Sequence, residues 1–279
     1  MDNINVIVNR TKNRAKVLTA SVSLVIAILL SGCGESSGGY RIIARLSSGE
    51  YAIAFRPDDR LGLIVGAALE ELVAEGTVAE LSRRWFGQDK TLLKGNADAL
   101  LELSQEIEIP AQRTLIVGTT TGAPPMCYRD ERGNYSGFDI ELARLVAEKL
   151  GWFITFQTIS PDNVRVELIS GNVDCAWGSM SFDRGDTKIA VSASYMSTDK
   201  VLVTRRDTSL RTKLGMRGKD LGLTYDPNSL AALQGDERLA NSINAYIRYQ
   251  STDLCFDALW AGECDAIIVD AIAVEYYGR

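Results

Sequence analysis

The chain has 279 residues, 46% of them apolar and 24% charged, which is an ordinary balance for a globular protein with one or two cores. Its net charge of -6 argues against nucleic acid as a partner. The sequence contains no histidine, which excludes histidine-based catalytic triads, the common histidine metal sites and histidine proton shuttling.

The first 32 residues have the pattern of an export signal. Basic residues between positions 10 and 16 precede an apolar run at 17–30, which ends in Leu30-Ser31-Gly32-Cys33. This run is too short to serve comfortably as a permanent membrane span. The ending resembles a bacterial lipobox, which implies lipid attached to Cys33 and a flexible tether over residues 33–39. The alternative is an ordinary cleaved signal followed by an incidental cysteine.

The pattern of residues 40–112 predicts a strand followed by helices. Residues 51–59 alternate like a strand that ends in a turn, and residues 61–72 have apolar side chains at helical spacing. A second short helix is expected to end at Trp85-Phe86-Gly87. Apolar residues near helical spacing at 97–109, with Pro110 after them, predict a linker helix, and a partly ordered tether is the alternative.

Residues 114–151 have the order strand, loop, helix. The apolar run 115–117 is closed by Gly118, as in a buried strand. After a loop rich in Thr, Gly and Pro, residues 138–150 carry an apolar stripe at helical spacing, and Gly151 stands where a helix end favours a left-handed residue. The loop would follow the carboxyl end of the strand, where open parallel sheets bind small ligands.

The sequence GTTTGAPPMCYRDERGNYSGFDIELARLVAEKLGW resembles the opening of the amino-acid-type (family 3) extracellular solute-binding proteins of ABC importers. The matching features are a Pro-Pro loop, a D-x-x-G turn and a helix that begins G-F-D-I-E-L-A. The resemblance implies an α/β fold of the bilobal periplasmic-binding-protein type II, in which two hinge strands join two lobes. Such a protein would close around a ligand without enzymatic chemistry, cofactor or metal.

Residues 40–90 resemble the way this family ends, although here they precede its opening. The sequence stops at Arg279, where the family would run on into a segment like residues 40–55. We therefore predict a circular permutant in which residues 91–112 join the family's usual ends. The alternative is a truncated tandem, which would leave two incomplete lobes with unpaired strand edges.

This hypothesis divides the chain into segments, and an internal repeat supports two similar lobes. Residues 168–179 and 259–270 share a helix end, a glycine, an aspartate and a short apolar strand. The predicted division is lobe 1 at 57–90 and 113–200, lobe 2 at 40–50 and 207–279, and hinge strands at 51–56 and 201–206.

The resemblance also implies how the two ends of an amino acid would be held. Ser179 and Ser181 would donate hydroxyl hydrogen bonds to its carboxylate, and Arg184 would supply a guanidinium fork. A solvated loop arginine is the alternative role for Arg184. Asp270 resembles the aspartate that accepts from the ligand's ammonium, and it could also cap the helix that follows.

Other positions depart from the family pattern and predict an altered ligand or lost binding. Asn228 follows Asp226-Pro227 where the family offers helix N–H donors to the carboxylate; proline removes a donor and aspartate adds like charge. Ala123 lies where the family has an aromatic clamp, and Trp177 or Tyr128 could replace that face or belong to the core. The predicted ligand-binding set is Thr120, Met126, Trp177, Ser179, Ser181, Arg184, Asn228 and Asp270.

Four cysteines remain after Cys33, and we expect them to be buried free thiols. Cys127, Cys175, Cys255 and Cys264 each lie beside apolar strand or helix residues. An exported chain could instead oxidise them, in pairings that the sequence does not choose. The sequence has no CxxC pair, so zinc binding and redox chemistry have little support.

These features together predict a monomeric, lipid-anchored solute-binding protein outside the cytoplasm, in the periplasm or at the cell surface. It would deliver an amino acid or similar small polar solute to an ABC permease. A ligand-sensing module for a membrane receptor is the main alternative. A dehydratase-like enzyme is less favoured because no carboxylate with a raised pKa is evident, and a degenerate homologue without ligand is also possible.

Overall fold

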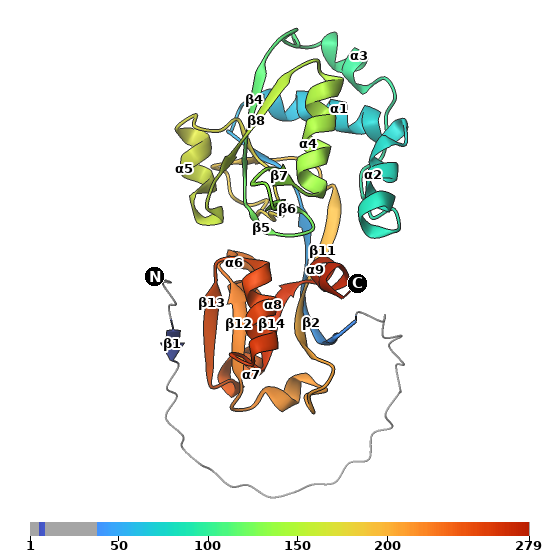
Figure 1. Cartoon of the computed structure of the whole chain (residues 1–279). Coiled ribbons are helices and arrows are strands. Elements are labelled where there is room, and N and C mark those ends of the chain that lie inside the picture. The colour runs from blue at the N-terminus through green and yellow to red at the C-terminus, as the bar shows by residue number, and fades with distance from the viewer. Residues whose placement is uncertain (1–5, 9–37, 279) are drawn as a thin grey trace, which may run out of the picture.

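The computed structural model describes residues 6–8 and 38–278, and it divides into two α/β lobes, each built on its own sheet (Figure 1). The upper lobe in Figure 1 has a five-stranded sheet and the lower lobe a six-stranded sheet. Most of the predicted signal peptide at 1–32, and Cys33 that follows it, lie outside the described residues. No helix in the described part is long and apolar enough to cross a membrane.

The six-stranded sheet has the order β1-β13-β12-β14-β11-β2. β12 runs parallel to β13 and β14, whereas β11 is antiparallel to both β14 and β2. Val201 and Val203 face one apolar cluster and Leu202 faces the other, so both faces of the sheet are covered. The strands are β1 (Val6–Val8), β2 (Tyr40–Tyr51), β11 (Met196–Arg205), β12 (Asp220–Thr224), β13 (Ala245–Tyr249) and β14 (Ala266–Asp270). The helices of this lobe are α6 (Pro227–Gln234), α7 (Glu237–Ser242), α8 (Thr252–Ala261) and α9 (Ala271–Tyr277), and a 3-10 turn spans Lys213–Met216.

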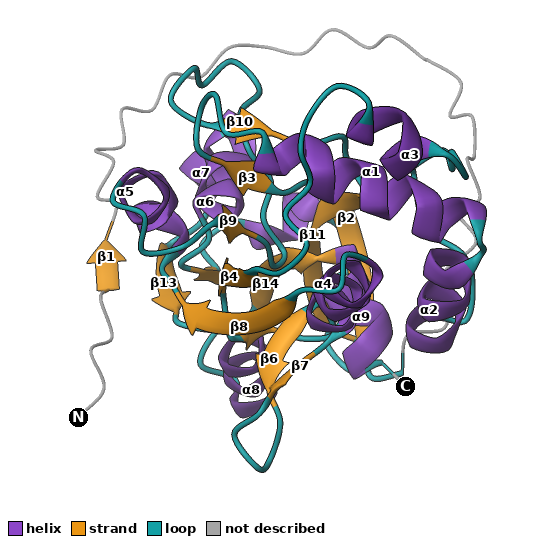
Figure 2. Ribbon diagram, turned by 90° about the horizontal axis from the view of Figure 1, so that it is seen from above, coloured by secondary structure: helices purple, strands orange, loops and turns teal. Residues whose placement is uncertain are grey.

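The five-stranded sheet has the order β10-β3-β9-β4-β8, with β4 parallel to β8 and β9. Helix α5 lies on one side of it and α1, α2 and α4 lie on the other (Figures 1 and 2). The strands are β3 (Ala54–Phe55), β4 (Thr114–Thr119), β8 (Phe153–Thr158), β9 (Cys175–Ala176) and β10 (Ala190–Val191). The helices are α1 (Leu61–Ala74), α2 (Thr77–Phe86), α3 (Ala99–Ser104), α4 (Phe138–Lys149) and α5 (Val164–Ile169), with a 3-10 turn at Pro161–Asn163. A small sheet of β5 (Gly122–Ala123), β6 (Cys127–Arg129) and β7 (Tyr135–Ser136) faces the other lobe.

The predicted strand-loop-helix unit at 114–151 is present. β4 covers the predicted strand and α4 the predicted helix, and Gly151 has the left-handed φ of 69° that was expected after the helix end. The internal repeat is also present, because α5 and α8 each end near a glycine with positive φ, Gly171 and Gly262, before a strand of their own lobe. The predicted linker helix is shorter than expected and spans only α3.

Residues 40–90 contribute to both lobes. β2 pairs with β11 at the edge of the six-stranded sheet, and β3 pairs with β9 and β10 in the other sheet. Helices α1 and α2 pack against α4, and their apolar residues join the core that also contains Leu115 and Val117 of β4. This early segment therefore belongs to the same lobes as the later part of the chain.

The chain passes between the lobes twice, along 52–53 and 192–195. The two passages run side by side, because the Tyr195 N–H donates to Tyr51 O at 3.0 Å and the Ser192 N–H to Ile53 O at 2.9 Å. Tyr51 through Phe55 are all buried, so the strand-like alternation predicted for 51–59 is absent where both faces are covered. The second hinge strand was predicted at 201–206, but residues 201–205 continue β11 inside the six-stranded sheet, where 201–203 also pair with β14.

Gly38, the first residue of the described range 38–278, lies against Gly278, the last. A Cβ added to Gly38 would come within 2.4 Å of the Gly278 carbonyl oxygen. The two backbone segments are therefore in contact, on the six-stranded lobe.

Candidate functional site

A cleft of about 820 Å³ lies between the lobes. From the upper lobe it is lined by residues that follow β4 and β9, Thr120 to Ala123 and Ser179 to Phe182. From the lower lobe it is lined by segments after β12 and β13 and by Asp270 at the end of β14. The carboxyl ends of parallel strands from both sheets therefore face one space, which is the usual place for ligands in α/β sheets.

Five of the predicted ligand-binding residues are brought together at this cleft. They are Thr120, Ser179, Ser181, Asn228 and Asp270. The Asn228 side-chain amide reaches across the cleft to the Ser181 carbonyl at 3.4 Å. These residues come from four segments that are far apart in the chain: the loops after β4 and β9, the start of α6 and the end of β14.

Three predicted residues do not line the cleft. Met126 and Trp177 are each 1% exposed and lie in the core of the upper lobe, because apolar side chains beneath the cleft floor fill the space between sheet and helices. Arg184 is exposed and lines an adjoining hollow, where its guanidinium donates to Ser194 Oγ at 2.7 Å. That hollow shares Ser181 and Asn228 with the cleft.

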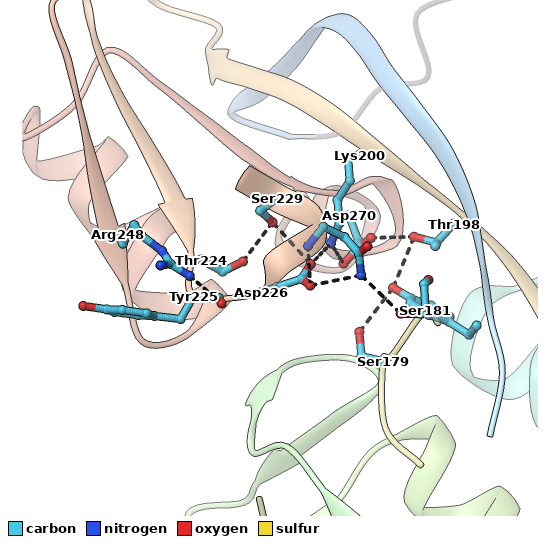
Figure 3. A network of polar contacts seen from close by, with 12 residues as sticks. Ser179, Ser181, Thr198, Lys200, Thr224, Tyr225, Asp226, Ser229, Arg248 and Asp270 are labelled. Atoms are coloured by element: carbon cyan, nitrogen blue, oxygen red, sulfur yellow. Dashed lines mark hydrogen bonds and ion pairs between the residues drawn. The ribbon is translucent and has the colours of Figure 1, made fainter. Parts of the chain in front are cut away.

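A buried ion-pair cluster forms the floor of the cleft in the lower lobe (Figure 3). The Lys200 ammonium, only 8% exposed, contacts Asp226 and donates to Asp270 Oδ2 at 2.8 Å. Thr198 donates to the other oxygen of Asp270 at 2.5 Å. Asp270 was predicted as the acceptor for a ligand's ammonium, and here an ammonium of the chain itself occupies that role.

Electrostatics favour the charged forms of Lys200 and Asp226. Burial alone would lower the pKa of Lys200, but Asp270 and Asp226 raise that pKa above its ordinary value. Burial alone would raise the pKa of Asp226, and the nearby Lys200 instead holds that pKa below its usual range. Sequence reasoning missed this cluster, because a lysine in the middle of a strand gives no sign of which carboxylates it will meet.

The start of α6 is already satisfied by its own side chains. Asp226 is the N-cap and accepts from the Asn228 N–H at 3.0 Å, and Pro227 at the first helical position has no N–H to offer. The expectation that Asp226 and Pro227 weaken an anion site here agrees with this geometry.

On the opposite side of the cleft, Ser179 is held by a buried carboxylate. Its N–H donates to Asp139 Oδ2 at 2.7 Å, and its φ of 52° places it in the left-handed region. Burial raises the pKa of Asp139 to about 7. Asp139 is 1% exposed and does not line the cleft, so a carboxylate with a raised pKa exists but has no access to a substrate.

A hydroxyl relay connects these two sides through the hinge. The Tyr51 hydroxyl, at the end of β2, shares hydrogen bonds with Ser179 Oγ at 3.3 Å and with Thr198 Oγ1 at 3.2 Å. Thr198 in turn contacts Asp270, so polar contacts run from the upper lobe to the floor of the lower lobe (Figure 3).

All four cysteines of the described region are buried free thiols, as expected. Burial raises the pKa of both Cys127 and Cys264 to about 12, so these sulfurs remain protonated and unreactive at neutral pH. Within the described residues, no group of three acidic or cysteine side chains could hold a metal ion.

Comparison with known proteins places the chain in a family. Residues 115–261, just over half of the chain, match the model of bacterial extracellular solute-binding proteins, family 3. The lysine/arginine/ornithine-binding periplasmic protein of Escherichia coli (strain K12) is 25% identical over 162 residues, which cover 57% of this chain and 62% of that protein. The arginine-binding extracellular protein ArtP of Bacillus subtilis (strain 168) is 27% identical over 168 residues, covering 60% and 64% respectively.

Solved structures give the same result. An ABC uptake transporter substrate-binding protein from Streptococcus pneumoniae with bound histidine superposes with a TM-score of 0.55 and 30% identity, over 59% of this chain and 68% of that one. The arginine-bound form of truncated ArgBP from T. maritima gives a TM-score of 0.51 and 25% identity, over 59% and 76%. The chain belongs to the family 3 extracellular solute-binding proteins. Its match spans less than two thirds of the two curated relatives described above.

Proposed function

We propose that this chain is the solute-binding component of an ABC importer and that it binds an amino acid or similar small polar solute by closure of its two lobes. The observation that carries the proposal is the cleft between the lobes, lined from both sides by residues at the carboxyl ends of parallel strands. Two adjacent passages join the lobes, which is the geometry of a hinge.

Family membership supports a binding role. The relatives named above are binding proteins for basic amino acids, and the two solved structures hold histidine and arginine. A dehydratase-like activity has less support, because the carboxylate with a raised pKa, Asp139, is buried away from the cleft.

The proposed ligand contacts are the five cleft residues, Thr120, Ser179, Ser181, Asn228 and Asp270. Ser181→Trp would place a bulky side chain between the lobes, next to Asn228, without entering the buried core. Isothermal titration of the purified chain with amino acids tests the proposal: the wild type should bind at least one of them, and this variant should not. Equal binding by both proteins would show that the ligand does not bind in this cleft.

We also propose that the chain is a circular permutant of its family. Three features support this: residues 40–90 add strands to both sheets, the family match begins only after them, and Gly38 lies against Gly278. The predicted lobe divisions are changed at the hinge: the passages lie at 52–53 and 192–195, so β3 belongs to lobe 1 and all of β11 belongs to lobe 2.

Anchoring and delivery complete the proposal. A lipid on Cys33 would tether the monomer outside the cytoplasm, where it would deliver its solute to an ABC permease. Labelling of cells with radioactive palmitate tests the anchor, because the wild type should incorporate label and Cys33→Ser should not. A sensing role for a membrane receptor is the alternative, and loss of solute uptake in a deletion strain would favour transport over sensing.

A further inference from the structure

We propose that the ligand of this cleft is a small organic cation, an amine or guanidinium compound, for which a carboxylate group is not required. This inference rests on the proposed function and names its ligand class. It follows from the charges that line the cleft, from the hydrogen-bond donors that are already used, and from the apolar walls between them.

Negative charge exceeds positive charge at the cleft. The charged residues that line it are Asp162, Arg165, Asp186, Asp226 and Asp270, and Lys200 lies behind the last two. Arg165 is paired with Asp186, so these two residues cancel. Lys200 is shared by two carboxylates, so one negative charge of the buried cluster has no ion-pair partner of its own among the described side chains. The nearby Arg248 donates instead to the Tyr225 carbonyl and lies over the Tyr225 ring.

Both carboxylates of the cluster remain in reach of a ligand. The side chains of Asp226 and Asp270 are 22% and 15% exposed, and both line the cleft. A carboxylate has about four acceptor positions. Asp226 already accepts from Lys200, Asn228 and Ser229, whereas Asp270 accepts, among the described residues, only from Lys200 and Thr198 and can take a further N–H donor. A single ammonium or guanidinium placed here would neutralise the cluster.

A ligand carboxylate, in contrast, finds little to bind. Arg165 and Lys200 are committed to aspartates, and Arg184 is turned toward Ser194 in the adjoining hollow. Two backbone N–H groups at the cleft, those of Asn228 and Ser179, already donate to carboxylates of the chain. An added anion would face like charge without a free cation in the part of the cleft that the structure describes.

The walls between the charged groups suit an alkyl chain. Apolar side chains that line the cleft include Ile159, Val164 and Met180 from the upper lobe and Leu254 from the lower lobe. Asp162, an exposed carboxylate at the upper wall, has no ion-pair partner among the described residues. A ligand with one cationic end at Asp270 and an apolar body would therefore find a matching partner for each of its parts.

The test compares amino acids with the amines that differ from them only by loss of the carboxylate. Isothermal titration of the full chain would use arginine against agmatine, lysine against cadaverine and histidine against histamine. We expect at least one amine to bind as tightly as its parent amino acid or more tightly. If the parents bind and every amine binds more than tenfold more weakly, the inference is wrong and the proposed function stands. If neither class binds, both are wrong.

Variants of single aspartates test which carboxylate of the cleft contributes to binding of the amine. Asp226→Asn should weaken binding of the amine at least tenfold, because it removes the unbalanced negative charge. Asp236→Asn is the matched control, since Asp236 also caps a helix of the lower lobe and pairs with a lysine but does not line the cleft. If Asp226→Asn does not fold, Asp162→Asn replaces it and should weaken binding at least threefold. Unchanged affinity in a folded cleft variant would overturn the inference.

Discussion

Lys200 shows how a charged residue can be retained inside a folded protein. Its ammonium is 8% exposed, which would be costly for an isolated charge, but two aspartates surround it. Those aspartates are likewise satisfied by Thr198, Asn228 and Ser229. The three charges depend on one another, so removal of the central one should be far more disruptive than removal of a surface ion pair.

Lys200→Met should therefore destabilise the protein strongly. It leaves Asp226 and Asp270 poorly solvated and without their counter-ion, and we expect a loss of about 3 kcal/mol in the free energy of unfolding. Lys213→Met is the matched control, because its pair with Asp236 is 39% exposed at the lysine and should contribute less than about 1 kcal/mol. Urea unfolding of both variants measures the difference; equal losses would show that the cluster has no special importance for stability.

Asp139 should make stability depend on pH. Burial raises its pKa from 3.8 to about 7 in the folded protein, so the folded state binds a proton that the unfolded state has lost between these pH values. The stability that this proton provides is complete below about pH 4 and is lost as pH rises through 7. The effect is on the order of 4 kcal/mol for a shift of this size.

Urea unfolding of wild type and Asp139→Asn between pH 4 and 8 tests this. The difference in unfolding free energy between the two proteins should change steeply across that range, because asparagine cannot titrate but can still accept from the Ser179 N–H. A difference that is constant with pH would contradict the raised pKa of Asp139.

Individual site residues were predictable only where a local pattern or the family resemblance marked them. Ser179 and Asp270 follow short apolar strands and do line the cleft. Trp177 follows the same strand as Ser179 but lies in the core. Two residues that are only two positions apart can therefore lie one in the core and the other at the cleft. Lys200 and its partner Asp270 are 70 residues apart in the chain, so no local pattern could join them.

Among the secondary-structure elements, α4 and β4 were predicted closely because their amphipathic or apolar patterns are local. The hinge was not. Residues 51–55 are buried on all sides, so the alternation that would mark one exposed face is absent. β2 begins at Tyr40, eleven residues before the predicted hinge strand, and its pairing with β11 depends on residues more than 140 positions away.

A fragment of residues 113–279 should fail to fold. It lacks β2, β3, α1 and α2, and with them buried residues of the upper core such as Phe55, Leu61 and Leu69. It would also leave β11 without its edge partner. Circular dichroism during urea titration should show no cooperative transition, and a cooperative transition would contradict the placement of residues 40–90 in both lobes.

The complementary rearrangement should fold. A chain that starts at residue 113, runs to Gly278, continues directly at Gly38 and ends at residue 112 keeps every segment of residues 38–278 and changes only their order; among the described elements it lacks β1. The contact between Gly38 and Gly278 allows this junction to be short. Its urea midpoint should lie close to that of the original order, and failure to unfold cooperatively would argue against permutation.

The molecule as a whole is held together across the cleft by few contacts. The lobes are joined by the two passages and by side-chain bridges that include Asn228 with Ser181, the Tyr51 hydroxyl with Ser179 and Thr198, and an ion pair of Lys90 with Glu275 at 2.9 Å. Bridges as few as these suit a protein that opens and closes, and a bound ligand would add contacts to both sides. The two-lobed architecture was predictable because the resemblance covers both repeat segments.

The most direct test of ligand binding between the lobes is a thermal-shift screen of the full chain against amino acids and their amines, with Thr120→Trp as a variant that blocks the cleft. A ligand at a hundred times its Kd stabilises the folded state by about 2.7 kcal/mol, which raises Tm by several degrees. We predict such a shift for at least one compound in the wild type and none in the variant. A folded wild type that no compound stabilises, or a shift that persists in Thr120→Trp, would contradict binding at this cleft.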